Sequence, residues 1–238
     1  MSAYYKLFKH VLIGPPLKGY YRPWAEGVEN VPDSGGAILA SNHLAVSDSF
    51  FLPLVLKRKV VFLGKSEYFT GKGVKGYATR SFMEGVGTIP VHRGGGRASE
   101  AALRTGLQVL QSGELLGIYP EGTRSPDGRL YRGKTGLARM AIEAGVPIIP
   151  VAMIGTDVAQ PLGKKVPSRT DIGVRIGPAV RLDAYAGRQD DRDALREVTD
   201  SVMVAIQELS GQEYVDRDAA QYKRELERDG KLPGSPPS

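Results

Sequence analysis

Residues 37–56 read AILASNHLAVSDSFFLPLVL, and this stretch decides the fold class. It opens with the apolar run 37–40, as a buried strand does, and turns apolar again from residue 50 onward. Ser47 or Asp48 can cap a helix between the two runs. One of the three histidines of the chain, His43, lies on the connection, five residues before Asp48. The stretch therefore predicts a strand, a polar loop and a helix.

The same alternation continues along the chain. Further strand-like runs cover 60–64, 88–92, 115–120, 148–154 and 172–177. Helical patterns cover 97–112, 134–145 and 191–209. Strands separated by helices predict an α/β fold, with a largely parallel or mixed sheet flanked by helices in a single domain. We expect an N-terminal helix in 1–24, the main domain in 25–210 and a charged C-terminal tail in 211–238 that frays.

Composition narrows the classes of function. The 238 residues include no cysteine, which excludes disulfides, thiolate metal sites and a cysteine nucleophile. The net charge of +6 suits nucleic acid, anionic lipid or a phosphorylated substrate. Aromatic residues are not interleaved with basic ones, so nucleic acid is not an expected partner. The longest apolar run, 146–155, holds two prolines and falls short of the roughly 20 residues of a spanning helix, and no secretory pattern is present. An intracellular protein is expected.

Two interpretations fit the N-terminal segment AYYKLFKHVLIG, residues 3–14. Its aromatic and aliphatic residues fall roughly on one side of a helix, with Lys6, Lys9 and His10 among them. Such a helix can lie in a membrane interface with its lysines near phosphates. It can equally be a first helix packed on the core.

The pair His43 and Asp48 suits proton abstraction. On one continuous helix a spacing of five places the two side chains about 140° apart, which is poor for a hydrogen bond. The pair works if His43 lies on the loop and Asp48 in the first helical turn, with the amide of Asn42 helping to position that loop. The imidazole can then act as a general base that the carboxylate orients. The alternative is a structural turn in which Asp48 is only a helix cap.

A compact polar site follows the strand-like run 115–120. Glu121, Gly122, Thr123 and Arg124 stand together in PEGTRS, residues 120–125. Arg124 can bind a phosphate through two hydrogen bonds, and Glu121 can orient the Arg124 side chain. The glycine lets backbone N–H groups approach the anion. Arg93, after the run 88–92, is a second candidate for anion binding. The alternative is an exposed turn with an ordinary ion pair.

The stretch 128-GRLYRGKT-135 formally matches the phosphate-binding pattern G-x-x-x-x-G-K-[ST]. A phosphate-binding loop of that kind must begin where a strand ends, yet here residues 121–127 intervene. Nucleotide hydrolysis is therefore not the favoured interpretation, although Lys134 can still help to bind an anion at the start of the next helix.

Four short blocks occur in order along the chain. They are N-H-x-x-x-x-D at 42–48, a loose G-x-I-x-x-x-R at 87–93, Y-P-E-G-T-R-S at 119–125 and V-P-I-x-P-V at 146–151. Together they resemble the glycerolphosphate and lysophosphatidate acyltransferase family over roughly residues 25–180. The resemblance implies that His43 and Asp48 are catalytic, and that Arg93, Glu121, Gly122, Thr123 and Arg124 bind substrate.

The resemblance also implies the reaction and the partners. A long acyl chain moves from acyl-CoA or acyl-carrier protein to the sn-2 hydroxyl of lysophosphatidate, with no acyl-enzyme, metal or cofactor. The protein is expected to act peripherally at an anionic membrane surface, on the cytoplasmic side of the cell membrane. Another lysophospholipid or a glycolipid is an alternative acceptor. A non-catalytic lipid-surface binding protein is the alternative of a different class.

Overall fold

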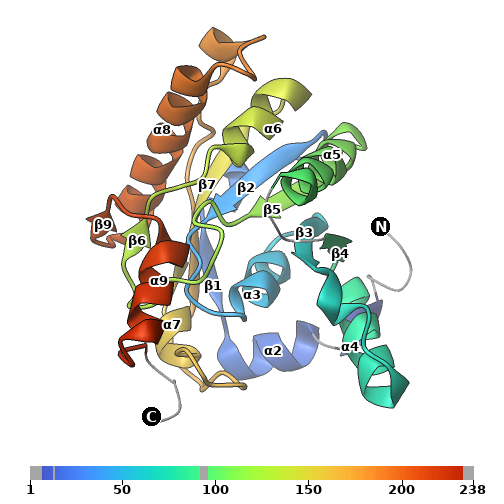
Figure 1. Cartoon of the computed structure of the whole chain (residues 1–238). Helices are drawn as coiled ribbons and strands as arrows, with labels where there is room; N and C mark the ends of the chain where they lie inside the picture. The colour runs from blue at the N-terminus through green and yellow to red at the C-terminus, as the bar shows by residue number, and fades with distance from the viewer. Residues whose placement is uncertain (1–6, 13, 92–95, 233–238) are drawn as a thin grey trace.

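A seven-stranded sheet forms the centre of the computed structural model, which describes residues 7–12, 14–91 and 96–232 (Figure 1). Its strand order is β1-β8-β7-β2-β5-β3-β4. The bounds are β1 (Trp24–Glu26), β2 (Ala37–Ser41), β3 (Val60–Lys65), β4 (Thr88–Val91), β5 (Leu115–Ile118), β7 (Ile148–Ile154) and β8 (Gly173–Ile176). All neighbours pair in parallel except β7 and β8, so the predicted mixed α/β sheet is confirmed.

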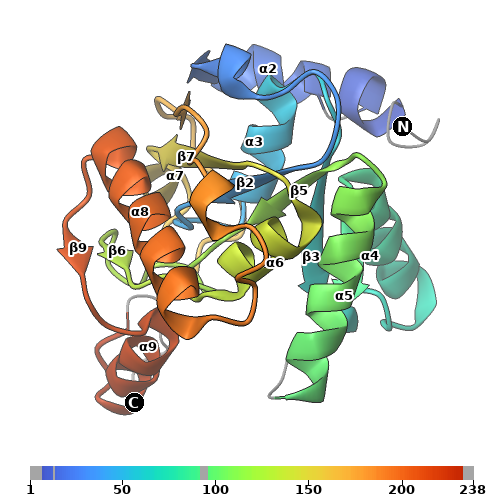
Figure 2. The ribbon, with the colours of Figure 1, turned by 90° about the horizontal axis from the view of Figure 1, so that it is seen from above.

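Helices cover both faces of this sheet, as Figure 2 shows. One face packs against α5 (Arg97–Gln111), α6 (Gly136–Ala144) and α8 (Arg192–Ser210). The other packs against α2 (Gly14–Tyr21) and α3 (Asp48–Val55). The remaining α-helices are α4 (Gly73–Gly85), α7 (Thr156–Ala159) and α9 (Ala219–Arg228). Short 3₁₀ or π turns cover Phe8–Leu12, Val28–Asn30, Ser66–Tyr68 and Asp183–Tyr185.

Strand β2 lies in the middle of the sheet and carries the loop with His43. Ile38 and Ala40 point into the core cluster that includes α5, α6 and α8, whereas Ala37 and Leu39 point into the cluster that includes α3. All four side chains are fully buried, which explains why this strand is continuously apolar. Because β5 and β7 flank β2 in parallel, the loops after these three strands meet at one edge of the sheet.

The C-terminal segment corrects the expectation of a fraying tail. β9 (Tyr214–Val215) pairs in parallel with β6 (Leu130–Tyr131), and α9 follows with Ala219 fully buried. Residues 211–232 therefore form part of the folded domain. Two-residue strands carry no usable hydrophobic period, so β6, β9 and the three-residue β1 left no signal in the sequence.

The N-terminal segment also differs in part from expectation. Lys9 does not face outward: its Nζ donates to the carbonyl oxygens of Leu56 at 2.5 Å and Arg58 at 3.3 Å. Burial, with the nearby charge of Lys18, lowers the pKa of Lys9 to about 8. Tyr4, Tyr5 and Lys6 lie outside the described residues. The idea that the lysines of this segment contact lipid phosphates is therefore wrong for Lys9.

A glycine pair tests how tightly the centre of the sheet is packed. A Cβ at Gly117 in β5 would lie 2.3 Å from Cε1 of the buried Phe62 ring, whereas a Cβ at Gly136 in α6 would meet nothing within 4 Å. We expect Gly117→Ala to lower the free energy of unfolding by about 1–3 kcal/mol. Gly136→Ala should leave it unchanged or raise it by up to about 1 kcal/mol. Urea denaturation of both variants measures this, and equal midpoints would contradict the packing described.

Candidate active site

His43 and Asp48 meet at the carboxyl end of β2. His43 lies on the loop 42–47, and Asp48 begins α3. The imidazole Nδ1 is 2.9 Å from Oδ2 of Asp48. Asp48 is fully buried, whereas the His43 side chain keeps 16% of its surface exposed. The loop and the first helical turn thus place the two groups as the spacing argument required.

Asp48 serves the loop as well as the histidine. Its Oδ2 also accepts hydrogen bonds from the backbone N–H of Leu44 at 2.7 Å and of Ala45 at 2.9 Å. Within the described residues, its buried Oδ1 has no hydrogen-bond partner. An ionised carboxylate only accepts, so Nδ1 of His43 carries the proton that it donates to Asp48. Nε2 is then the free, basic nitrogen. Ser47 is the N-cap of α3, and the Asp48 carboxylate binds loop N–H groups before the helix, so the alternative that Asp48 is only a helix cap is wrong. The role of the pair as an oriented general base stays a prediction.

Tyr119 fixes the plane of the imidazole. The His43 and Tyr119 rings stack with their centroids 3.7 Å apart and their planes 10° apart. The Tyr119 hydroxyl lies 2.8 Å from the Ser49 hydroxyl. Burial, with the nearby charge of Asp48, raises the pKa of Tyr119 well above its ordinary value, so the phenol stays neutral. Sequence reasoning placed Tyr119 at the end of a strand and in the block 119–125 but missed this contact, because no pattern along the chain pairs it with His43.

Two amide side chains tie the loop to distant parts of the chain. Asn42 donates through Nδ2 to the Met153 carbonyl at 3.1 Å and to Oε1 of Gln212 at 2.7 Å. Its Oδ1 accepts from the Met153 N–H at 2.7 Å. The Ser47 N–H donates to Oε1 of Gln160 at 2.9 Å. Asn42 therefore positions the loop, as its place beside His43 suggested, by clamping it to β7.

Glu121 requires a correction, because it does not orient Arg124. Its side chain is 1% exposed. Oε1 accepts from the His43 N–H at 3.2 Å, and Oε2 accepts from the Tyr131 N–H at 2.9 Å. Burial raises the pKa of Glu121 to about 8, with smaller upward contributions from the charges of Asp48 and Asp127 that the two backbone N–H groups oppose. Glu121 therefore links the histidine loop to β6 through two hydrogen bonds of its buried carboxyl group.

The rest of PEGTRS lies at the surface beside Glu121. Gly122 has φ +73 and is exposed, whereas Thr123 and Arg124 are half-buried. Within the described part of the chain, no carboxylate lies at ion-pair distance from Arg124. The Ser125 N–H donates to the His43 carbonyl at 2.7 Å, which joins the two loops. Arg93 lies outside the described residues.

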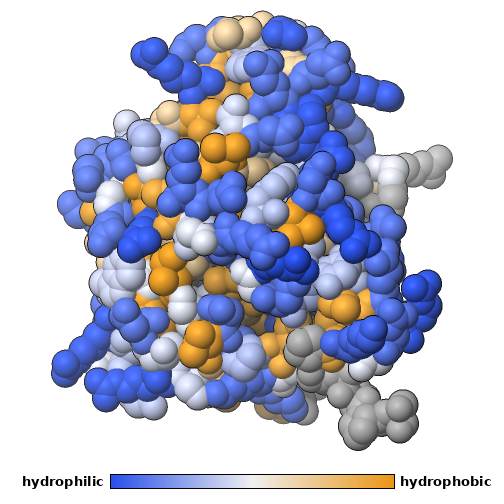
Figure 3. Space-filling model, turned by 90° about the vertical axis from the view of Figure 1, so that its left-hand side faces the viewer, coloured by the Kyte–Doolittle hydropathy of each residue, from blue (hydrophilic) through white to orange (hydrophobic). Residues whose placement is uncertain are grey.

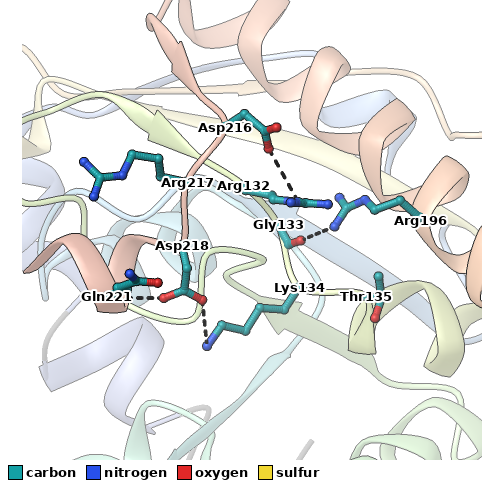
Figure 4. A pocket seen from close by; sticks show the side chains of 9 residues that line it. All are labelled: Arg132, Gly133, Lys134, Thr135, Arg196, Asp216, Arg217, Asp218 and Gln221. Carbon is teal, nitrogen blue, oxygen red and sulfur yellow. Dashed lines mark hydrogen bonds and ion pairs between the residues drawn. The ribbon is translucent and has the colours of Figure 1, made fainter.

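The phosphate-loop pattern at 128–135 is interrupted by β6 and therefore does not form a loop of that kind. Its last three residues, Gly133, Lys134 and Thr135, line an open cavity of about 630 Å³ (Figure 4). Lys134 lies 3.8 Å from Asp218 there, and Arg196 donates to the Gly133 carbonyl at 2.8 Å. Among the described residues, no group of three or more acidic or histidine side chains is placed to hold a metal ion.

The Acyltransferase family model matches residues 23–154, which is more than half of the chain and includes both His43 and Arg124.

This chain belongs to the acyltransferase family.

Two relatives and one solved structure illustrate the membership. A chloroplastic 1-acyl-sn-glycerol-3-phosphate acyltransferase of Arabidopsis thaliana is 32% identical over 161 residues, covering 67% of this chain and 42% of the relative. The 1-acyl-sn-glycerol-3-phosphate acyltransferase of Bacillus subtilis is 30% identical over 147 residues, covering 61% and 69%. The chain thus spans less than half the length of the plant relative. The crystal structure of 1-acyl-sn-glycerophosphate acyltransferase PlsC from Thermotoga maritima has a TM-score of 0.61 at 24% identity, covers 83% and 80% of the two chains, and shares the fold.

The raised pKa of Glu121 predicts a pH-dependent stability. Below about pH 4.5 the carboxyl is protonated in both the folded and the unfolded chain. Between pH 4.5 and about 8 only the unfolded chain releases the proton, so the contribution of Glu121 to stability is lost as the pH rises. Glu121→Gln removes this titration. We therefore expect the destabilisation caused by Glu121→Gln to shrink with rising pH, by up to about 1.4 kcal/mol per pH unit in that window.

Urea titrations of wild type and Glu121→Gln from pH 5 to 8 measure the difference. Glu29→Gln is the matched control, because Glu29 is exposed. Its curve should stay parallel to that of the wild type. A Glu121→Gln curve that also stays parallel would contradict the buried, uncharged carboxyl.

Proposed function

We propose that this protein moves a long acyl chain from a thioester to the sn-2 hydroxyl of lysophosphatidate and so makes phosphatidate. The observation that carries the proposal is the His43–Asp48 pair, with a buried carboxylate, a fixed Nδ1 proton and an exposed imidazole edge. The names of the two relatives supply the acceptor. The acyl donor is acyl-CoA or acyl-carrier protein, and no cofactor enters the proposed reaction.

The pair supplies general-base chemistry to this reaction. Nε2 of His43 takes the proton of the acceptor hydroxyl, and Asp48 stabilises the resulting imidazolium through Nδ1. The hydroxyl oxygen attacks the thioester carbonyl, and the tetrahedral intermediate collapses with cleavage of the C–S bond. The thiolate leaves with the proton that His43 returns. Because the acceptor hydroxyl attacks directly, no acyl-enzyme forms.

The phosphate of the acceptor is proposed to bind close to His43. We place its phosphate at Arg124, with the Gly122 and Thr123 backbone alongside and Arg93 as a further ligand. The absence of an ion-pair partner for Arg124 among the described residues supports this role, since a half-buried guanidinium is left to meet an external anion. The family resemblance implied that Glu121 binds substrate. Its two oxygens accept from the His43 and Tyr131 N–H groups, which supports a role in holding the loop instead. Another lysophospholipid or a glycolipid remains the alternative acceptor.

Thiol release tests the chemistry. We expect palmitoyl-CoA to release thiol when lysophosphatidate is added, and His43→Ala to lower that rate by about 10²–10⁴-fold, because a positioned general base contributes that much. Asp48→Asn should lower kcat with little change in acceptor KM, since it loses the orientation of the base.

An acceptor panel serves as the control for this test. Neutral monoacylglycerol should support much less release than lysophosphatidate. A His43→Ala rate equal to that of the wild type would remove the proposed base. Vesicle binding without any thiol release, from any donor and acceptor pair, would favour the non-catalytic lipid-binding alternative.

We further propose that the protein works peripherally at the cytoplasmic face of an anionic cell membrane. None of the helices in the described part of the chain is long and apolar enough to cross a bilayer. Exposed apolar side chains occur in the N-terminal segment, at Leu7, Val11, Leu12 and Tyr20, and in α4, at Val74 and Tyr77. The face of the molecule at α8 is mainly hydrophilic, with separate small apolar patches (Figure 3). The N-terminal side is therefore the proposed contact with lipid.

Charge placed on that side should weaken the contact. We expect Val11→Asp combined with Leu12→Asp to reduce binding to vesicles of phosphatidylglycerol by about tenfold or more, because two apolar side chains no longer enter the interface. Vesicle flotation measures this. The control is Val204→Asp on α8, where Val204 is similarly exposed at 53%. Equal flotation of all three proteins would contradict the proposed surface.

A further inference from the structure

Helix α9 presents a lysine on its packed face. Ala219, Tyr222, Lys223 and Leu226 follow the i, i+3, i+4, i+7 spacing of one helix face, and all four are buried or half-buried. The other side of the helix carries exposed residues: Gln221, Arg224, Glu227 and Arg228. Lys223 therefore points toward the domain. A lysine on the packed face of an amphipathic helix is uncommon unless a negatively charged group pairs with it.

Two contacts fix α9 against the loops of the active site. The Tyr222 ring lies 5.7 Å from the ring of Tyr131, whose N–H is bound by Glu121. At the start of the helix, Asp218 accepts from the Gln221 N–H at 2.8 Å and lies 3.8 Å from Nζ of Lys134 (Figure 4).

The second of these contacts reaches PEGTRS itself. A Cβ on Gly122 would lie 3.2 Å from Cε of Lys134, so the Lys134 side chain runs beside that exposed glycine. Helix α9 is therefore held beside PEGTRS, next to the residues proposed to bind substrate.

Three cations gather at this place. Because α9 packs beside PEGTRS, Lys223 on its packed face lies on the side of Arg124. The positive charges of Arg124 and of Lys65, at the end of β3, act on it there. Burial and these two charges lower the pKa of Lys223, and the carboxylate of Glu227 opposes them only in part. Within the described residues, no carboxylate lies at ion-pair distance from any of the three. Positive charges kept together with no carboxylate at ion-pair distance are the arrangement that an anionic ligand stabilises.

We propose that Lys223 is a ligand of the acceptor's phosphomonoester, supplied by α9 and acting together with Arg124. The proposal rests on the proposed function. It assigns a substrate-binding role to a residue well beyond the part of the chain that the family model matches, residues 23–154. A phosphomonoester carries close to two negative charges at neutral pH and has three acceptor oxygens, so it can bind a guanidinium and an ammonium at once.

Steady-state kinetics with lysophosphatidate and palmitoyl-CoA test the assignment. We expect Lys223→Gln to raise the KM for lysophosphatidate by about tenfold, because a charged hydrogen bond is lost. The KM for palmitoyl-CoA should stay the same, and Lys223→Arg should keep most of the acceptor affinity. The matched control is Arg224→Gln, which removes one positive charge from the next, exposed residue. Arg124→Ala provides the reference loss.

Binding without acyl transfer gives a second readout. Glycerol 3-phosphate should raise the midpoint of thermal unfolding of the wild type and of Arg224→Gln, and raise that of Lys223→Gln less at the same concentration. Uncharged glycerol at that concentration controls for solvent effects. This arm keeps failure of the inference separate from failure of the proposed reaction, since it needs no thiol release.

Three results would overturn the assignment. One is an acceptor KM and a glycerol 3-phosphate shift that are the same in Lys223→Gln as in the wild type. Another is a rise confined to the KM for palmitoyl-CoA, which would assign the lysine to the phosphates of the donor. The third is an equal loss in Lys223→Gln and Arg224→Gln, which would reduce the effect to net charge.

Discussion

One buried carboxyl group holds the candidate site together. Glu121 bridges two backbone N–H groups, those of His43 and Tyr131, and so joins the histidine loop to the small β6–β9 sheet. Its burial is costly for a charged group, which is why its pKa rises to about 8. The carboxyl therefore stays uncharged below about pH 8, and its two oxygens give both backbone N–H groups an acceptor inside the protein. The position of His43 depends on this hydrogen bond as well as on Asp48.

Around Glu121, buried polar groups orient the loops, and a half-buried arginine lies beside them. Asp48, Asn42 and Glu121 are each almost fully buried, and each satisfies more than one donor or acceptor of the loops around His43. Many arginines elsewhere on the surface pair with a carboxylate, as Arg196 does with Asp200. Arg124 does not, within the described part of the chain. The site therefore combines buried, hydrogen-bonded polar groups with an arginine that has no ion-paired carboxylate among the described residues.

The sequence predicted the parts of the site whose geometry is set by residues close together in the chain. The apolar run 37–40, the loop and the helix start placed His43 and Asp48 correctly, because their geometry depends on six consecutive residues, 43–48. The role of Glu121 could not be predicted, since it is set by Tyr131, a residue in a two-residue strand. Tyr119 stacks on His43 through the neighbouring strand β5, and no sequence period reports such a contact. Helix α9 was hidden by its high charge, which resembles that of a solvated tail.

The long-range clamps on the histidine loop bear on the order in which the protein becomes competent during synthesis. Asn42 is held by Met153 and Gln212, and Ser47 by Gln160, so the supports lie 111 to 170 residues downstream of the groups that they hold. The ribosome delivers the chain from its N-terminus, and contacts of such sequence separation form late. The His43–Asp48 hydrogen bond can form as soon as α3 does, but its loop is fixed only after Gln212 has emerged. A ribosome-bound nascent chain thus carries the chemical groups of the site long before it carries the site.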